Sequence, residues 1–420
     1  MRGRQNRVAD ENTFFTADSL TVERLSWLGE IMKYYCTWIY PESLHHHPRT
    51  PIPPFTFFFS GEACYSLIDR QNLQFWELLY RLPPFRCVFD LRELRLRGIA
   101  IEPFRMRSPD QIIPAGVETG NPGDPFWDLL LQETCETTGQ QSIGFLQVHS
   151  PYMHRSAALG PRLLLAAVHR GVSPEFYGFL DGVHAVHRDQ RPAGMENVGE
   201  SLNEVNTLAL KMGLSPRIIA CSRSATSRGY STFVQEEGSI LSSCTIPRVR
   251  IRDIGDVADR FCQGHPVLSH ASFSIRIMKQ RRFPEVKAPE HQDPPPLVLF
   301  VSHSPYGTEM AIGAITLALA CAKRGITTRV VFIEDGVYCL AGHHAPDEDN
   351  PVFNVQSVIE ATSSGENLEY YSYIPSFKKR GLTGAMAPRC VVAVEPAGLA
   401  QVLFHPPGGV DADRQRSLIF

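Results

Sequence analysis

The C-terminal part of the chain alternates short apolar runs with longer stretches of helical period. Residues 297–301, Leu-Val-Leu-Phe-Val, form a continuous apolar run, which is typical of a strand buried on both faces of a parallel sheet. A helical stretch follows at 310–323, before Gly325, a residue type that often ends helices. Further runs at 329–333 and 368–374 predict two more strands. The alternation predicts an α/β domain with a mostly parallel sheet flanked by helices.

The middle of the chain shows the same alternation, and the first part shows a weaker form of it. In the middle we predict strands at 142–148, 176–180, 217–221 and 267–268, and helices at 162–169, 199–212 and 254–261. In the first part we predict strands at 55–59 and 86–89 and a helix at 73–82, with the remnant of a first strand within 23–39. Residues 1–12 are expected to be disordered.

Three short motifs recur at nearly one spacing. His149-Ser150-Pro151-Tyr152 returns 154 residues later at 303–306, and Asp181-Gly182-Val183 returns 154 residues later at 335–337. Arg228-Gly229 returns 152 residues later at 380–381, and a further Arg-Gly pair stands at 97–98. Such spacing indicates a repeated domain. We therefore predict three domains at 1–140, 141–278 and 297–420, with a proline-rich linker at 279–296 and a degenerate first copy.

Composition excludes several classes of function. The formal net charge of −3 over 420 residues, with no basic block, gives no electrostatic basis for direct nucleic-acid binding. No apolar run reaches the length of about 18 residues that a membrane span requires, and no secretory signal is evident, so we expect a cytoplasmic protein. The ten cysteines lack zinc-site spacing, and His45-His46-His47 is expected to be a solvated loop. Phosphate-binding glycine motifs and the G-x-S-x-G motif are absent, so dinucleotide oxidation, nucleotide hydrolysis and serine hydrolysis lack their usual supports. We expect no cofactor and no metal.

Cys221 is the strongest candidate for chemistry. It lies at the end of a predicted strand, seven residues before Arg228, whereas the other copies have Tyr373 and Asp90 at the corresponding position. Open α/β sheets bind ligands at the carboxyl ends of their strands. A reactive thiol needs a lowered pKa; backbone N–H groups of the following turn, the charges of Arg223 and Arg228, and hydrogen bonds from Ser222 and Ser224 are predicted to favour the thiolate. The alternative is that Cys221 is an inert buried strand residue.

The other repeated motifs favour structural roles. Ser150 and Ser304 are predicted to cap a helix whose first residue is the following proline. The functional alternative is that Ser150 and Tyr152 line a pocket beside Cys221. Asp181 and Asp335 are expected to lie in turns. Cys244 and Cys262 follow Cys221 in the same copy, and the alternative to a core role is that one of them resolves a disulfide formed by Cys221.

The ordered set of motifs resembles the DsrE/DsrF family of sulfur-relay proteins, which includes the TusB, TusC and TusD subunits. The resemblance rests on residues 299–307 and 332–338 in the last copy, and on 149–152, 180–183 and 219–229 in the middle copy. Family members that carry persulfide sulfur hold a cysteine about seven residues before such an Arg-Gly pair, and Cys221 matches it. The resemblance implies three tandem DsrE-like domains arranged as a pseudo-trimer, and a homodimer that forms a pseudo-hexamer.

The same resemblance implies a function. Cys221 would accept and pass on sulfane sulfur, from a small TusA-like donor to a DsrC/TusE-like acceptor. Two other functions remain open from the residues alone. One is a non-catalytic DsrE-like scaffold or regulatory binding protein, because two of the three copies lack the cysteine. The other is a small-molecule binding protein that uses the pocket at the strand ends.

Overall fold

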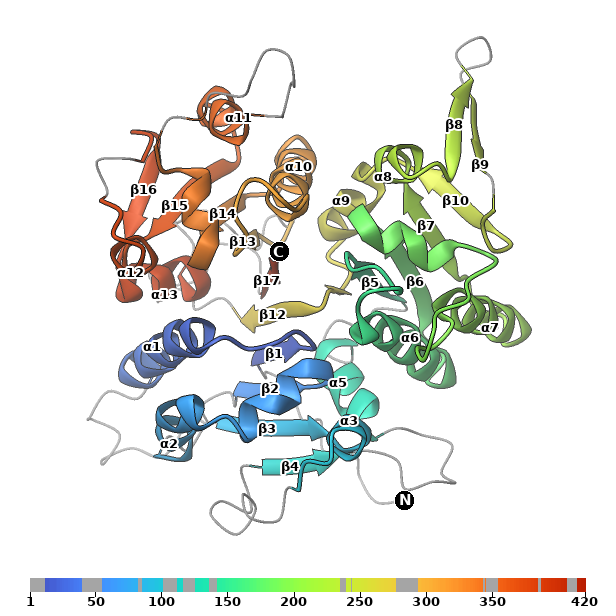
Figure 1. Ribbon diagram of the computed structural model, residues 1–420, viewed down its shortest axis with the longest axis horizontal. Coiled ribbons are helices and arrows are strands. Elements are labelled where there is room, and N and C mark those ends of the chain that lie inside the picture. The colour runs from blue at the N-terminus through green and yellow to red at the C-terminus, as the bar shows by residue number, and fades with distance from the viewer. Residues whose placement is uncertain are drawn as a thin grey trace, which may run out of the picture.

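The computed structural model contains three α/β segments (Figure 1). We call them the first segment (12–135), the middle segment (142–268) and the third segment (294–420). The structure describes residues 12–39, 55–81, 85–100, 112–115, 125–135, 142–234, 239–242, 244–276, 294–342, 344, 354–383, 387–405 and 414–420. His45-His46-His47, residues 1–11 and most of the predicted linker lie outside this range. Among the described helices, none is long and apolar enough to cross a membrane.

The third segment is a five-stranded parallel array. Its strands are β13 (Leu297–Val301), β14 (Thr328–Phe332), β15 (Leu368–Tyr373), β16 (Val391–Val394) and β17 (Arg414–Ile419), in the order β16-β15-β14-β13-β17. Its helices are α10 (Met310–Ala322), α11 (Val355–Thr362), α12 (Ile374–Lys379) and α13 (Pro396–Phe404). The predicted strands at 297–301, 329–333 and 368–374 are confirmed to within one residue.

The middle segment has the same strand order in a separate sheet. The strands are β5 (Ser142–Gln147), β6 (Ser173–Gly178), β7 (Arg217–Cys221), β10 (Val249–Arg252) and β11 (Val267–Leu268), all parallel, in the order β10-β7-β6-β5-β11. The helices are α6 (Leu159–His169), α7 (Val198–Lys211), α8 (Ser222–Ser227) and α9 (Gly255–Cys262), and a hairpin of β8 (Ser231–Val234) and β9 (Ser239–Ser242) projects from it. The predicted elements of this segment are confirmed to within three residues.

The first segment contains β1 (Asn12–Thr16), β2 (Phe55–Phe59), β3 (Phe85–Asp90), β4 (Ile112–Ala115), α1 (Val22–Ile39), α2 (Leu73–Arg81), α3 (Leu91–Leu96) and α5 (Pro125–Cys135). The expectation of a strand remnant within 23–39 is wrong, because these residues belong to helix α1. Apolar side chains on one face of α1, including Leu25, Leu28, Ile31 and Tyr35, are buried at a helical spacing. The first strand is β1 instead, which begins at Asn12, a residue expected to be disordered.

One strand that the sequence pattern did not predict joins two segments. β12 (Ala271–Arg276) pairs antiparallel with both β1 and β17, so the first and third segments form one ten-stranded sheet. Figure 1 shows β12 between the three segments. In sequence β12 falls within the predicted 141–278 domain, yet its strand neighbours belong to the first and third segments.

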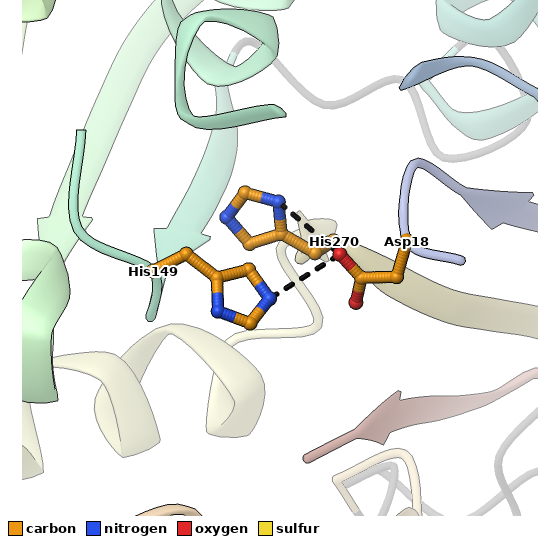
Figure 2. Close-up of side chains that lie close together, drawn as sticks. All are labelled: Asp18, His149 and His270. Carbon is orange, nitrogen blue, oxygen red and sulfur yellow. Dashed lines mark ion pairs between the residues drawn. The ribbon is translucent and has the colours of Figure 1, made fainter. Parts of the chain in front are cut away.

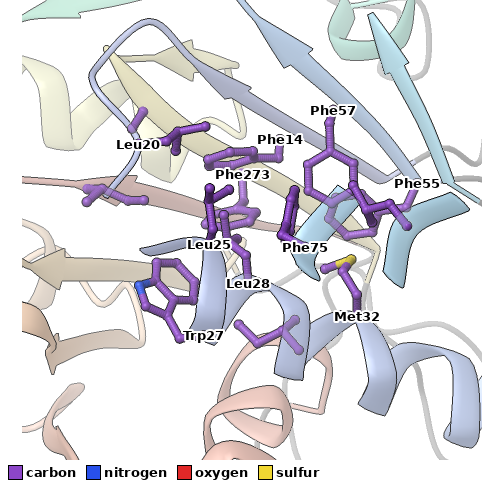
Figure 3. Packing of buried hydrophobic residues seen from close by; sticks show 14 of the residues in the cluster. Phe14, Leu20, Leu25, Trp27, Leu28, Met32, Phe55, Phe57, Phe75 and Phe273 are labelled. Carbon is purple, nitrogen blue, oxygen red and sulfur yellow. The ribbon is translucent and has the colours of Figure 1, made fainter. Parts of the chain in front are cut away.

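Aromatic packing fixes this sheet beneath α1. Phe55 and Phe57 lie on the same face of β2, two residues apart, and their rings stack with centroids 4.9 Å apart. Figure 3 shows them in one apolar cluster with side chains of α1 and with Phe273 of β12. Trp27 of α1 also stacks on Phe300 of β13, with a centroid distance of 5.4 Å. Helix α1 therefore covers strands of two segments and limits their relative motion.

The repeated Asp-Gly motifs lie in 3-10 helices that follow the second strand of a segment. These are η5 (Leu180–Val186) and η6 (Glu334–Cys339), and η2 (Gly61–Leu67) occupies the same place after β2. The first residue of each has a positive φ: 51° at Gly61, 52° at Leu180 and 50° at Glu334. The predicted turn at Asp181 and Asp335 is confirmed in this form.

Candidate functional site

Cys221 lies where the predicted strand ends. It is the last residue of β7 and the N-cap residue of α8, with φ −60° and ψ 124°. The side chain is 6% exposed and packs in an apolar cluster with Leu180 and Ile254, together with residues of α10 from the third segment. Within the described residues, no hydrogen bond to the Cys221 Sγ is present. The thiol therefore lies at the carboxyl edge of the sheet, beside the junction of the middle and third segments.

The three residues after Cys221 differ in their surroundings. Ser222 is half-buried and Arg223 is exposed. The Ser224 side chain is buried, and its Oγ accepts a hydrogen bond of 3.0 Å from the Leu180 backbone N–H. This contact attaches α8 to the start of η5. The Ser224 hydroxyl thus satisfies a backbone group in the strained first residue of η5.

Arg228 is bound by carboxylates of two segments. Its Nε and Nη2 donate to Asp181 Oδ1 at 2.9 and 2.7 Å, and Nη2 also donates to Glu309 Oε2 at 2.6 Å. Glu309 is the N-cap residue of α10 in the third segment. The guanidinium is therefore oriented toward these acids, and within the described residues no hydrogen bond or ion pair joins it to Cys221.

Ser150 does not cap a helix. Its Oγ accepts a hydrogen bond of 3.3 Å from the Tyr152 N–H within a turn, and α6 begins only at Leu159. In the third segment Ser304 Oγ donates to the Tyr306 carbonyl, and α10 begins at Met310. The predicted helix caps are wrong in both copies, because the Ser-Pro pair forms a local turn that precedes the helix.

Tyr152 belongs to a cluster of tyrosine and histidine side chains. Its hydroxyl shares a hydrogen bond of 2.9 Å with His187 Nδ1, and its ring lies 5.9 Å from that of His184. His184 Nδ1 hydrogen-bonds the Tyr230 hydroxyl. Burial lowers the pKa of His184 and raises the pKa of Tyr230 to about 12, so neither group is charged near neutral pH. No hydrogen bond or ring contact links Tyr152 to Cys221 in the described part of the chain.

The positions that correspond to Cys221 have the same backbone setting. Asp90 is the N-cap residue of α3, and Tyr373 is the N-cap residue of α12. Asp90 accepts hydrogen bonds from the Arg92 and Glu93 backbone N–H groups and from the Ser60 hydroxyl. Burial raises the pKa of the Tyr373 hydroxyl. Of the three positions, only that of Cys221 has a thiol.

The contacts around these positions also recur. Ser376 Oγ accepts from the Glu334 backbone N–H at 2.9 Å, as Ser224 does from Leu180. Arg380 donates to Asp335 Oδ1 at 2.9 and 2.7 Å, as Arg228 does to Asp181. The Asp-Gly and Arg-Gly motifs, which the sequence places 47 and 45 residues apart, thus form an ion pair in both segments.

A second polar cluster was not predicted from the sequence. Asp18, His149 and His270 meet between the first and middle segments (Figure 2), with His149 Nε2 3.2 Å from Asp18 Oδ1. Burial raises the pKa of the Asp18 carboxyl, but His149, His270 and Arg24 outweigh it and hold that pKa well below its usual range. Burial, reinforced by His149, lowers the pKa of His270 to about 3, so this ring is uncharged near neutral pH. Only His149 belonged to a recognised motif.

One part of the chain matches a known protein family. Residues 296–403 match the model of the DsrE/DsrF-like family. The DsrE/DsrF-like match spans about a quarter of the 420 residues, from β13 to α13, and it includes Asp335, Tyr373 and Arg380. Cys221 lies outside the matched range.

The other comparisons add little. The solved structure described as the crystal structure of ychN protein from E. coli is 20% identical to this chain, and the alignment covers 30% of this chain and 99% of that one, with a TM-score of 0.25. No curated protein matches the chain.

Proposed function

We propose that this chain is a sulfur-relay protein in which Cys221 accepts and passes on sulfane sulfur. The observation that carries the proposal is the position of Cys221. It ends the third strand of the middle segment, beside a Ser-to-backbone contact and an Asp-Arg ion pair that recur in the DsrE/DsrF-like segment. In that segment Tyr373 stands at the same position, so the middle segment alone has the thiol.

The proposal includes three DsrE-like domains arranged as a pseudo-trimer. Its support is that the strand order of the middle and third segments is the same, and that β12-β1-β2-β3-β4 follows it with β12 reversed. In each segment an ion pair at or close to the Arg-Gly motif reaches the first helix of the next segment or its N-cap residue. These pairs are Glu93–Arg162, Arg228–Glu309 and Arg380–Glu23. The three pairs join first to middle, middle to third, and third to first, as a closed ring requires.

The proposed chemistry is a transfer between sulfur atoms. The Cys221 thiolate attacks the outer sulfur of a donor persulfide, a new S–S bond forms, and the donor S–S bond breaks. The donor leaves as a thiolate that takes up a proton, and Cys221 becomes a persulfide. The reverse attack by an acceptor thiolate then removes the outer sulfur, so no external oxidant is consumed.

The structure sets one condition on this chemistry. Because Cys221 is 6% exposed, its sulfur must become accessible when a donor binds.

We propose a small TusA-like donor and a DsrC/TusE-like acceptor. We also propose a homodimer that forms a pseudo-hexamer, and a cytoplasmic location. No disulfide joins the described cysteines, which accords with a reducing compartment.

A second candidate is a scaffold or regulatory protein without sulfur chemistry. Burial of Cys221 in an apolar cluster favours it, as does the engagement of Arg228 with Asp181 and Glu309. In that function the middle segment would bind a partner while the thiol only fills the core.

The deciding experiment compares intact masses after incubation with a persulfide donor. We expect the wild-type protein to gain about one sulfur mass, to lose it on reduction, and Cys221→Ser to gain nothing at that site. The matched control is Cys244→Ser, which removes an exposed thiol of the same segment and should leave the loading of Cys221 unchanged.

The result also separates the two candidates. If peptide mapping finds no added sulfur on Cys221 under conditions that load an established carrier, the sulfur-relay proposal fails and the scaffold function is favoured. A circular dichroism spectrum of Cys221→Ser establishes that loss of loading is not loss of the fold.

A further inference from the structure

Three side chains from distant parts of the chain converge on one point (Figure 2). Asp18 follows β1, His149 follows β5, and His270 precedes β12. Each offers one ligand atom, and these atoms all lie within 4.8 Å of one another. Asp18 Oδ1 lies 3.2 Å from His149 Nε2 and 4.0 Å from His270 Nδ1, and the two imidazole rings have centroids 4.4 Å apart.

The backbone holds the three residues in place. The Ala17 N–H donates to the His270 carbonyl at 2.8 Å, which fixes the residue before Asp18 against β12. Gln147 Nε2 donates to the His149 carbonyl at 2.8 Å. The Ser269 hydroxyl donates to the Leu146 carbonyl at 3.0 Å, which links the loop before β12 to β5. The convergence is therefore built into the fold and does not depend on flexible side chains.

His270 lacks the partners that a buried imidazole needs. Its side chain is 1% exposed, and neither Nδ1 nor Nε2 has a hydrogen-bond partner among the described residues. The ring of Phe145 packs edge-on against it at 5.3 Å and offers no polar atom. Buried polar groups in folded proteins are almost always satisfied, so an unpartnered imidazole aimed at a carboxylate and a second imidazole points to a missing ligand.

We propose that Asp18, His149 and His270 bind a divalent transition-metal ion of the zinc class. Two imidazoles and one carboxylate suit such ions, whereas Ca²⁺ and Mg²⁺ prefer oxygen ligands. For metal–ligand bonds of 2.0–2.2 Å, tetrahedral donors lie about 3.3–3.6 Å apart, and the distances of 3.2 and 4.0 Å found here are near that range. The Asp18 and His149 side chains are 25% and 13% exposed, which leaves a path for the ion and for a water as fourth ligand.

The proposed ion joins the ten-stranded sheet to the five-stranded sheet. Asp18 and His149 are 131 residues apart in sequence, and His149 and His270 are 121 apart, so the ion closes long loops of the chain. An ion that binds the folded state but not the unfolded chain stabilises the folded state. This inference does not rest on the proposed sulfur chemistry, because Cys221 contributes no ligand.

The test uses the full chain with the His45-His46-His47 tract changed to alanines, because that tract is a source of adventitious metal binding. After removal of metal with a chelator, the protein is titrated with Zn²⁺ by calorimetry and with Co²⁺ by visible absorption. We expect one equivalent of Zn²⁺, an absorption band of Co²⁺ bound to nitrogen and oxygen, and a higher melting temperature with Zn²⁺.

The variants locate the site. Asp18→Asn and His149→Gln change partly exposed ligands and are expected to fold. Each should weaken Zn²⁺ binding by more than about tenfold, because loss of a residue that only hydrogen-bonds a metal ligand already lowers metal affinity about 10–100-fold. The control His187→Gln removes a histidine of the Tyr152 cluster and should keep the wild-type affinity. Absence of stoichiometric Zn²⁺ binding at micromolar concentration, or unchanged affinity in both ligand variants, would overturn the proposal.

Discussion

Gly182 and Gly336 stand where no side chain fits. A Cβ at Gly182 would lie 1.8 Å from the carbonyl oxygen of Gln147, the last residue of β5. A Cβ at Gly336 would lie 1.8 Å from the carbonyl oxygen of Val301, the last residue of β13. We predict that Gly182→Ala and Gly336→Ala each lower the free energy of unfolding by about 3 kcal/mol, because the backbone itself must shift. Urea unfolding followed by tryptophan fluorescence measures the loss.

A suitable comparison is Gly213→Ala at the end of α7. Gly213 has a φ of 75° but open space around the position of a Cβ, so only the backbone penalty of about 1 kcal/mol applies. Equal losses at Gly182 and Gly213 would show that the close approach to Gln147 does not constrain the motif.

At this scale the sequence located Cys221 but not the Asp18-His149-His270 cluster. Cys221 follows an apolar run and precedes Arg228 by a fixed spacing, and both signals are local. The cluster combines residues more than 100 positions apart, in three loops without a common pattern. No periodicity in one sequence encodes such a contact.

Continuous apolar runs predicted most of the parallel strands of the middle and third segments, since strands buried on both faces have few polar residues. They did not predict β16 or β17, and β17 begins with the polar residues Arg414, Gln415 and Arg416. The predicted strand remnant within 23–39 is wrong, because the apolar side chains of this stretch recur at a helical spacing and belong to helix α1. The Ser-Pro turns were misjudged because a proline after serine is compatible with both a helix start and a turn.

Strand β12 is the element on which the ten-stranded sheet depends. Ser272 pairs with Phe15 of β1 and Leu418 of β17, so its backbone lies between two strands. We predict that Ser272→Pro lowers the free energy of unfolding by about 3 kcal/mol or more, because proline removes a ladder hydrogen bond and leaves a buried carbonyl unpaired. Chemical denaturation monitored by circular dichroism measures it.

The matched control at the same position is Ser272→Ala. The Ser272 hydroxyl is buried without a partner among the described residues, so its removal should be neutral or slightly stabilising. A proline variant as stable as the alanine variant would mean that β12 does not join the two segments.

For the whole molecule, the repeated spacing of motifs predicts three repeated domains, and the described strands and helices confirm the α/β character of the chain. It did not predict that the first and third segments share a sheet, because β12 is short and pairs with strands far away in sequence. Contacts between segments depend on surfaces formed only after each segment has folded. Arg24 of α1 illustrates this, since its partners Ser302 and Glu334 lie about 300 residues further along the chain.

Glu334 and Asp335 are adjacent carboxylates that allow a direct comparison of a buried contact between segments with an exposed contact within one segment. Glu334 is 9% exposed, accepts hydrogen bonds of 3.0 Å from Arg24 Nε and Nη2, and accepts one of 3.1 Å from Trp27 Nε1. Asp335 is 63% exposed and pairs with Arg380. The buried pair joins α1 of the first segment to η6 of the third.

We predict that Glu334→Gln lowers the free energy of unfolding by about 3–5 kcal/mol, because it leaves the buried Arg24 charge without its ion-pair partner. Asp335→Asn should cost less than about 1 kcal/mol, since water screens an exposed pair. The double variant Arg24→Met with Glu334→Gln should recover part of the loss, because the unpaired charge is gone. Thermal and urea unfolding of all three variants measure these differences. If Glu334→Gln costs no more than Asp335→Asn, the Arg24–Glu334 contact does not hold the first and third segments together.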